Sequence, residues 1–209
     1  MKFRPIAAAL GLALIASGLS VTSLADGNAA SGKVLAYTCH GCHGIPNYKN
    51  AYPNYSVPKL GGQHFTYLQN ALKAYASGER SHPTMRSHAA TMSEQDRADI
   101  AAYLSSKPEP AVEVVGTPPP VTQVCASCHG ADGAKTVAPD NPILAGQYRD
   151  YLIQALQDYK SGKRKNPIMA SMIATVDPKD FPAIAKFYSQ QKSLCSTDKV
   201  REQGRCGQP

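Results

Sequence analysis

The segment Tyr37-Thr-Cys-His-Gly-Cys-His-Gly44 (YTCHGCHG) decides how this chain is organised. Two cysteines are separated by two residues, and a histidine follows the second cysteine directly. The same spacing returns 86 residues later, in Cys125-Ala-Ser-Cys128-His129. Because both clusters have the pattern C-x-x-C-H, we expect them to have the same chemical role.

C-x-x-C-H is the attachment signature of a c-type haem. Two thiols at this spacing reach the two vinyl groups of one porphyrin, and the imidazole that follows lies under the ring as a ligand of the iron. We therefore expect two covalently bound haem c groups. The expected anchors are Cys39, Cys42, Cys125 and Cys128, and the expected iron-binding histidines are His43 and His129.

Three other uses of closely spaced cysteines compete with haem attachment. A structural zinc site needs two such pairs, or a cysteine pair and a histidine pair, that share one metal. A thioredoxin-like redox pair belongs in a βαβ pattern, which the sequence lacks. An ordinary disulfide forms readily in an exported chain but needs no histidine. None of the three requires a histidine after the second cysteine in two places, so haem attachment is favoured.

Downstream of the cysteine clusters, the two halves of the chain resemble each other at an offset of 84 residues. Pro58-Lys-Leu-Gly-Gly-Gln63 matches Pro142-Ile-Leu-Ala-Gly-Gln147, and a longer pattern of tyrosine, leucine, Ser-Gly-x-Arg and methionine follows each copy. Two copies indicate a duplicated domain. We expect an N-terminal domain at 26–106, a linker at 107–121 and a C-terminal domain at 122–190. The prolines of the linker resist helix formation and favour an extended connector.

Each half reads as helical. The apolar residues of 67–75 fall on one face of a helix, and Gly78 lies where that helix should end. Ser93-x-x-Asp96 is a capping pair for a second helix, whose counterpart is expected to begin at Asp177. A third helix at about 30–36 should lead into the first cysteine cluster. No alternating strand pattern is present, so the expected fold class is all-α.

Methionine is the expected second axial ligand of each iron. Among five methionines, only Met85 and Met169 occupy matching positions, each two residues after a proline. A methionine is often a flexible core filler, but the paired register favours ligation. His88 is the main rival in the first half and has no histidine counterpart in the second. His/Met ligation raises the reduction potential, and it fills both axial positions, which leaves the iron no open site for a substrate.

These motifs together resemble the cytochrome c4 family of dihaem proteins. The resemblance rests on both cysteine clusters, the Leu-Gly/Ala-Gly-Gln motifs, the helices that end in Ser-Gly-x-Arg and the matched methionines, and it runs from about Asp26 to Gln190. It implies two tandem cytochrome c-like domains, each wrapped around one covalent haem, that face each other across a pseudo-twofold axis with haem propionates at the interface. It also implies electron delivery to haem–copper terminal oxidases, some of them in the membrane, from an upstream electron donor.

We accordingly expect an electron carrier and not an enzyme. The alternative is a dihaem redox enzyme, such as a peroxidase or a sulfur-compound oxidase, that keeps one iron open. A third hypothesis is a soluble subunit bound permanently in a larger complex.

The first 25 residues have the layout of a secretory signal, with a positive start, an apolar run at about 6–19 and small residues up to Ala25. The run is shorter than the roughly 20 residues of a membrane span. We expect cleavage after Ala25, a periplasmic location and no membrane span in the mature chain. The mature chain has 20 basic and 15 acidic residues. This scattered excess argues against nucleic acid as a partner.

Several aromatic and histidine residues of the first half have no counterpart in the second. The loop at 45–55 contains three tyrosines, which we expect to pack against the porphyrin edge and to substitute for missing aromatic core. These are Tyr48, Tyr52 and Tyr55. The unmatched histidines are expected at the surface or at the haem periphery. They are His40, His64 and His82.

The tail at 191–209 departs from the resemblance. It carries Cys195 and Cys206, which lie outside both haem motifs. In an oxidising compartment these two most simply pair with each other and close a short loop. A tail that follows the second domain can cover part of that domain's surface.

Overall fold

The protein is described by a computed structural model that covers residues 26–52, 54–105, 113–203 and 206. The expected signal segment at 1–25 and residues 107–112 of the expected linker lie outside the described residues. Within the described ranges, helices and irregular segments make up the structure, and β-pairing is limited to isolated bridges. The expected all-α fold class is confirmed. No helix of this part of the chain is both long and apolar enough to cross a membrane.

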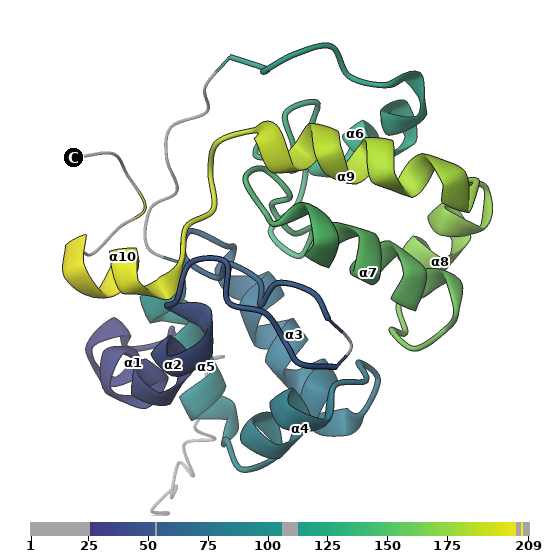
Figure 1. Ribbon diagram of the computed structural model, residues 1–209. Coiled ribbons are helices and arrows are strands. Elements are labelled where there is room, and N and C mark those ends of the chain that lie inside the picture. The colour runs from purple at the N-terminus through teal and green to yellow at the C-terminus, as the bar shows by residue number, and fades with distance from the viewer. Residues whose placement is uncertain (1–25, 53, 106–112, 204–205, 207–209) are drawn as a thin grey trace, which may run out of the picture.

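The first half forms one group of helices (Figure 1). The order is α1 (Ala29–Leu35), the 3₁₀ turn η1 (Ala36–Cys39), α2 (His40–His43), α3 (Phe65–Ser77), α4 (Pro83–Ala90) and α5 (Glu94–Leu104). The side chain of Ser93 accepts a hydrogen bond from the Asp96 amide and the Asp96 carboxylate accepts one from the Ser93 amide, which is the capping box predicted for α5. Gly78 ends α3 in the left-handed conformation at φ 82°, as expected for a glycine stop.

The second half repeats this order with small changes. It comprises the turn η2 (Pro120–Thr122), α6 (Gln123–His129), α7 (Arg149–Lys160), α8 (Pro167–Ala174), the turn η3 (Pro178–Asp180) and α9 (Phe181–Gln190). The last helix was expected to begin at Asp177. Asp177 instead caps the 3₁₀ turn by accepting from the Lys179 amide, and the α-helix follows from Phe181.

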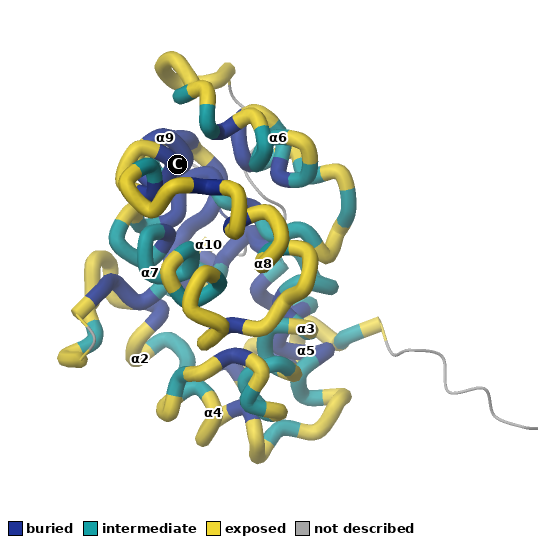
Figure 2. Tube along the Cα trace, turned by 90° about the vertical axis from the view of Figure 1, so that its right-hand side faces the viewer, coloured by how far each residue is buried: buried dark blue, intermediate teal, exposed yellow. Residues whose placement is uncertain are grey.

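Each half has its own apolar core, and the cores differ in their large residues. The second core is built mainly on α9, with Phe181, Ile184, Phe187 and Tyr188. Figure 2 shows buried stretches along α9, which has one face in the core, whereas α4 and α8 are exposed at most of their positions. The first core uses the smaller Ile100 and Leu104 and includes side chains that come from the C-terminal tail, so it is incomplete within the first domain alone.

The tail contacts both domains: Leu194 packs against Ile143 and Ala145 of the second domain, as its place in the sequence suggested, and the tail joins the first domain from Cys195 onward. Cys195 exchanges two backbone hydrogen bonds with Gly61, at 2.9 and 3.1 Å, and a disulfide joins Cys195 to Cys206. Helix α10 (Thr197–Gln203) then lies beside α2 (Figure 1) and buries Val200 in the first core. A Cβ atom on Gly61 would come within 2.6 Å of both the Cys195 sulfur and Val200, which explains the glycine.

Candidate haem-binding sites

The four motif cysteines are free thiols in the structure. Cys39 ends η1, Cys42 lies in α2, and Cys125 and Cys128 lie in α6. Burial raises the pKa of Cys39 above its usual value and that of Cys125 to about 11, so both are protonated thiols near neutral pH. Among the described residues, no three His, Cys, Asp or Glu side chains gather as a metal cluster, which gives no support to a structural zinc site.

The two motif histidines are held in the same way. His43 Nδ1 donates to the carbonyl oxygen of Pro58 at 2.7 Å, and His129 Nδ1 donates to that of Pro142 at 2.8 Å. Burial lowers the pKa of both imidazoles, in the case of His43 to about 4, so both are neutral at physiological pH. A carbonyl that holds Nδ1–H leaves Nε2 free as a metal ligand and fixes the orientation of the ring.

Both histidines, all four cysteines and the matched methionines line one cavity of about 390 Å³ that extends through both domains. Met85 lies in the first turn of α4 and Met169 in that of α8. The donor chemistry around this cavity fits c-type haem: it combines paired thiols, an imidazole with a free Nε2, a thioether and an apolar lining. His88, the rival ligand of the first half, also lines the cavity, as do Met92 and Met172.

The Met-bearing helices begin with equivalent caps. His82 Nδ1 accepts a hydrogen bond from the Met85 amide at 3.3 Å, and Asn166 Oδ1 accepts one from the Met169 amide at 3.0 Å. His82 was expected at the surface or at the haem periphery. It is half-buried and caps the N-terminus of α4, as Asn166 caps that of α8. The sequence signal for these caps was a residue with a hydrogen-bonding side chain directly before each Pro-x-Met motif, which is His82 in the first half and Asn166 in the second.

The other two unmatched histidines bridge separate parts of the chain. His40 Nδ1 forms a 2.8 Å hydrogen bond with the hydroxyl of Thr197 in the tail, next to the first cysteine pair. His64 Nε2 forms a 2.8 Å bond with the hydroxyl of Thr136 in the other domain. Neither contact is repeated in the other half, where Ala126 and Tyr148 stand in place of His40 and His64.

The expectation for the tyrosine-rich loop was wrong for two of its three tyrosines. Tyr52 is 95% exposed and Tyr48 43% exposed. Only Tyr55 is buried and lines the cavity. Ile45 of the same loop is exposed as well, and isolated aromatic residues at a surface are common.

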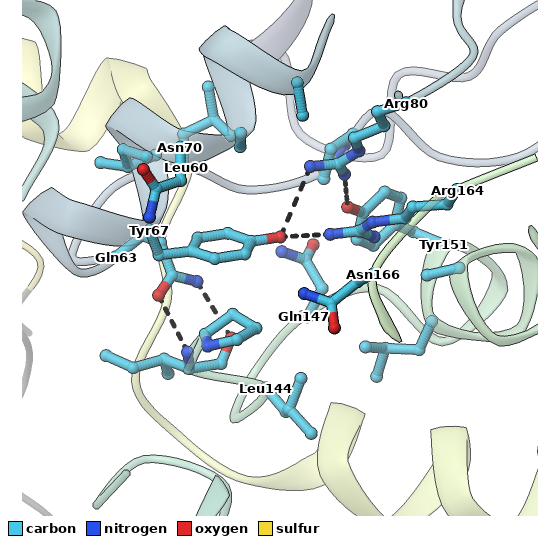
Figure 3. A pocket seen from close by; sticks show the side chains of 18 of the residues that line it. Leu60, Gln63, Tyr67, Asn70, Arg80, Leu144, Gln147, Tyr151, Arg164 and Asn166 are labelled. Atoms are coloured by element: carbon cyan, nitrogen blue, oxygen red, sulfur yellow. Dashed lines mark hydrogen bonds between the residues drawn. The ribbon is translucent and has the colours of Figure 1, made fainter. Parts of the chain in front are cut away.

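The centre of the interface holds a polar cluster that sequence reasoning missed (Figure 3). Arg80 and Arg164 lie beside each other in an isolated antiparallel bridge. Figure 3 shows their guanidinium groups pointing toward the hydroxyls of Tyr67 and Tyr151. All four residues belong to the 84-residue repeat, but the repeat alone does not indicate that copies from different domains meet.

Comparisons with known proteins agree with this arrangement. The cytochrome c family model matches residues 29–107 and 121–192, one C-x-x-C-H cluster in each range. Cytochrome c4 of Pseudomonas aeruginosa is 32% identical over 195 residues, which cover 83% of this chain and 94% of that protein. The structure of reduced recombinant cytochrome c4 from Pseudomonas stutzeri superposes with a TM-score of 0.62 at 26% identity, covering 79% of this chain and 99% of the other.

A further relative has a more specific name. A thiosulfate dehydrogenase electron acceptor of Stutzerimonas stutzeri is 28% identical over 173 residues, which cover 74% of this chain and 79% of that protein. The C-terminal tail after residue 192 lies beyond the part that the family model matches.

Proposed function

This chain belongs to the cytochrome c4 family, and from that premise we propose that it is an exported carrier of single electrons between redox proteins. The observation that carries the proposal is the duplicated set of donor groups around one cavity that extends through both domains. One such set is enough for a simple carrier. Two sets in one chain would provide two adjacent one-electron redox centres.

Family membership implies two covalently bound c-type haems, and both cysteine pairs fit the C-x-x-C-H pattern. When bound, such a haem supplies a one-electron couple at its iron. We propose that the cysteines anchor the two groups and that each iron has one histidine and one methionine ligand. The proposed axial ligands are His43 with Met85 and His129 with Met169.

The chain's own residues favour electron transfer over catalysis. The carbonyl oxygens of Pro58 and Pro142 hold the two imidazoles in one tautomer, which makes Nε2 a more basic ligand. The caps of α4 and α8 place both methionines at the start of a helix that faces the same cavity. A methionine ligand opposite each histidine would leave no position at the iron for oxygen, peroxide or a sulfur compound.

We propose the periplasm as the location. The sequence pattern of 1–25 is typical of a cleaved secretory signal. The disulfide between Cys195 and Cys206 supports the same compartment, because disulfides persist where the environment is oxidising.

The proposed electron acceptor is a membrane-bound haem–copper oxidase, supplied through this protein from an upstream donor. A second candidate role has its own support, since the named electron acceptor of Stutzerimonas stutzeri resembles most of this chain. In that role the upstream donor would be an enzyme that oxidises a sulfur compound. The enzyme hypothesis differs from both roles, because a chain with one haem open to peroxide or thiosulfate should turn over that compound by itself.

A redox titration of the purified holoprotein tests the proposal. We expect two haems per chain, two reversible one-electron steps, and rapid oxidation of the reduced protein by membranes that contain a haem–copper oxidase. Turnover of peroxide or thiosulfate faster than free haem achieves would support the enzyme instead. Rapid reduction by a thiosulfate dehydrogenase, without turnover by the chain alone, would support the second candidate role.

A further inference from the structure

Five consecutive residues of the C-terminal tail, 193–197, are buried, although they lie beyond the part of the chain that the family model matches. We call them the bridging segment. The backbone polar groups of a buried segment need partners, and here the partners come from both domains. The Leu194 amide donates to the Ala145 carbonyl at 3.1 Å, and Cys195 exchanges two hydrogen bonds with Gly61. Two adjacent residues of the bridging segment are therefore bound to different domains.

The two positions that the bridging segment contacts are equivalent in the repeat, because Gly61 and Ala145 are 84 residues apart. The side chains follow the same division as the backbone. Leu194 packs with Ile143 and Ala145 of the second domain, whereas Cys195 belongs to the core of the first. Opposite directions for successive side chains are typical of an extended segment. The bridging segment thus runs between the two copies of one motif and contacts each copy with one residue.

The bridging segment is anchored at both ends. Before it, Gln191 follows directly after α9, and its side chain exchanges two hydrogen bonds with Val115 of the linker, both at 2.9 Å. After it, the disulfide to Cys206 and the buried side chain of Val200 hold α10 in the first core. Figure 1 shows the tail crossing from α9 of the second domain to α10 beside the first. Separation of the two domains would therefore pull on a segment that is fixed in both.

The direct contacts between the domains leave a role for such a segment. Many of their hydrogen bonds come from polar side chains, among them Gln63, Gln147 and Arg80. Relative motion of two domains is the default expectation unless their interface is large and apolar. The bridging segment adds backbone hydrogen bonds to both domains and one buried apolar side chain, that of Leu194.

We infer that the bridging segment is a clamp that holds the two domains, and with them the two candidate haem sites, at a fixed separation. Leu194 and Cys195 are positioning residues in this role. The consequence for electron transfer rests on the proposed function, because it concerns two haems. Transfer between two redox groups slows steeply as their separation grows, so a pair of domains that open and close passes electrons more slowly. The clamp itself rests on the chain's own contacts.

Amide hydrogen exchange in the reduced holoprotein, followed by nuclear magnetic resonance, tests the clamp with Leu194→Ala. The reporter is the Lys59 amide, which donates to Gln147 of the other domain at 2.9 Å and lies in the domain that the Leu194 side chain does not contact. Truncation of a buried leucine removes enough free energy to favour opening of the interface. We expect the Lys59 amide to exchange about tenfold faster or more than in the wild type.

The matched control is Val200→Ala, which truncates another buried side chain of the tail. Val200 packs in the first core alone, so its contacts persist when the domains separate. We expect this variant to lower the midpoint of denaturant unfolding and to leave the Lys59 amide at its wild-type rate. Equal acceleration in Leu194→Ala and Val200→Ala would mean that the tail acts only through overall stability, and it would overturn the inference. An unchanged rate in Leu194→Ala would do the same.

Gly61→Ala tests the clamp from the first domain and replaces Leu194→Ala if that variant does not fold. A Cβ atom on Gly61 would come within 2.6 Å of the Cys195 sulfur and 3.0 Å of the Cys195 carbonyl oxygen. Gly61 is not among the glycines with positive φ, and its repeat counterpart is Ala145, so alanine suits this backbone and displaces the tail. The reporter here is the Ile143 amide, which donates to Gln63 at 2.8 Å. We expect it to exchange faster, and a wild-type rate would contradict the clamp.

Pulse-radiolytic reduction of the dihaem protein measures the consequence for electron transfer. The equilibration between the two haems that is independent of protein concentration is the intramolecular step. We expect its rate constant to fall several-fold in Leu194→Ala and Gly61→Ala and to keep its wild-type value in Val200→Ala. A wild-type rate constant in variants whose interface amides exchange faster would overturn the positioning role. A wild-type protein without two reversible haem steps would instead contradict the proposed function and leave the result from amide exchange standing.

Discussion

Gln63 and Gln147 make the same pair of hydrogen bonds in opposite directions across the domain interface. The Gln63 side chain accepts from the Ile143 amide at 2.8 Å and donates to the Ile143 carbonyl at 3.0 Å. The Gln147 side chain accepts from the Lys59 amide and donates to the Lys59 carbonyl, both at 2.9 Å. Lys59 and Ile143 are themselves 84 residues apart. The repeat therefore encodes an interface with twofold character, in which each glutamine completes the backbone of the other domain.

Replacement of one glutamine should weaken this interface. Gln63→Ala leaves the buried amide and carbonyl of Ile143 without their partner, and we expect the free energy of unfolding to fall by about 2–4 kcal/mol. Gln147→Ala should have an effect of similar size. Denaturant titration of the holoprotein measures both. Gln157→Ala, at an exposed position of α7, is the matched control and should change the free energy by less than about 0.5 kcal/mol.

The sequence was informative where a contact lies within one domain. The capping box of Ser93 and the glycine stop at Gly78 depend on residues close in the chain, so their patterns could be read directly. Gln63 was visible as a repeated residue, but its partner belongs to the other copy, and no local pattern indicates which copies meet.

The tail shows a second limit of the sequence. Cys195 and Cys206 were recognisable as a pair, yet the tail crosses from the second domain to the first, where Gly61 leaves room for it. The corresponding residue in the second copy is Ala145. The glycine at 61 in place of the alanine at 145 was the only difference in these motifs that indicated the contact with the tail. It could be interpreted only after the position of the tail was known.

The methionines of α4 and α8 should be distinguishable from their neighbours by ligand binding. In Met85→Ala and Met169→Ala we expect one haem each to lose the near-infrared methionine–iron band of the oxidised protein and, once reduced, to bind carbon monoxide. Met92→Leu and Met172→Leu remove methionines that also line the cavity and should leave the band and the carbon monoxide response unchanged. In the first domain, an unchanged Met85→Ala spectrum would point to His88 as the ligand.

The disulfide of the tail should stabilise the first domain. It closes a loop between residues 11 apart, and both sulfurs are buried in the first core. We expect Cys206→Ser to lower the free energy of unfolding by about 2–4 kcal/mol. Denaturant titration with and without a reductant provides the control, because reductant should bring the wild-type protein close to the variant and leave the variant itself unaffected. Equal stability of the two proteins without reductant would contradict this role.

Asp150 should make the interface sensitive to acid. Burial alone would raise the pKa of its carboxyl, but hydrogen bonds from the Ser56 hydroxyl at 2.9 Å and the Ser56 amide at 3.0 Å, with the Lys49 ammonium at 3.3 Å, outweigh burial and hold the pKa below its ordinary 3.8. A carboxyl with a lowered pKa in the folded state stabilises that state at higher pH. Its contribution diminishes as the pH falls below the ordinary value toward the lowered one.

The change that tests this is Asp150→Asn, measured as the midpoint of denaturant unfolding from neutral to strongly acidic pH. We expect wild type to be more stable than the variant at neutral pH, with a difference that narrows below about pH 4, where the Asp150 carboxyl of the unfolded chain takes up its proton before that of the folded protein does. Asp180→Asn in the η3 turn removes a carboxylate without touching Ser56 and should not reproduce this narrowing. A difference that stays constant with pH would mean that the contact acts through packing and not through charge, since only the ionised carboxylate accepts from Ser56 and Lys49 at once.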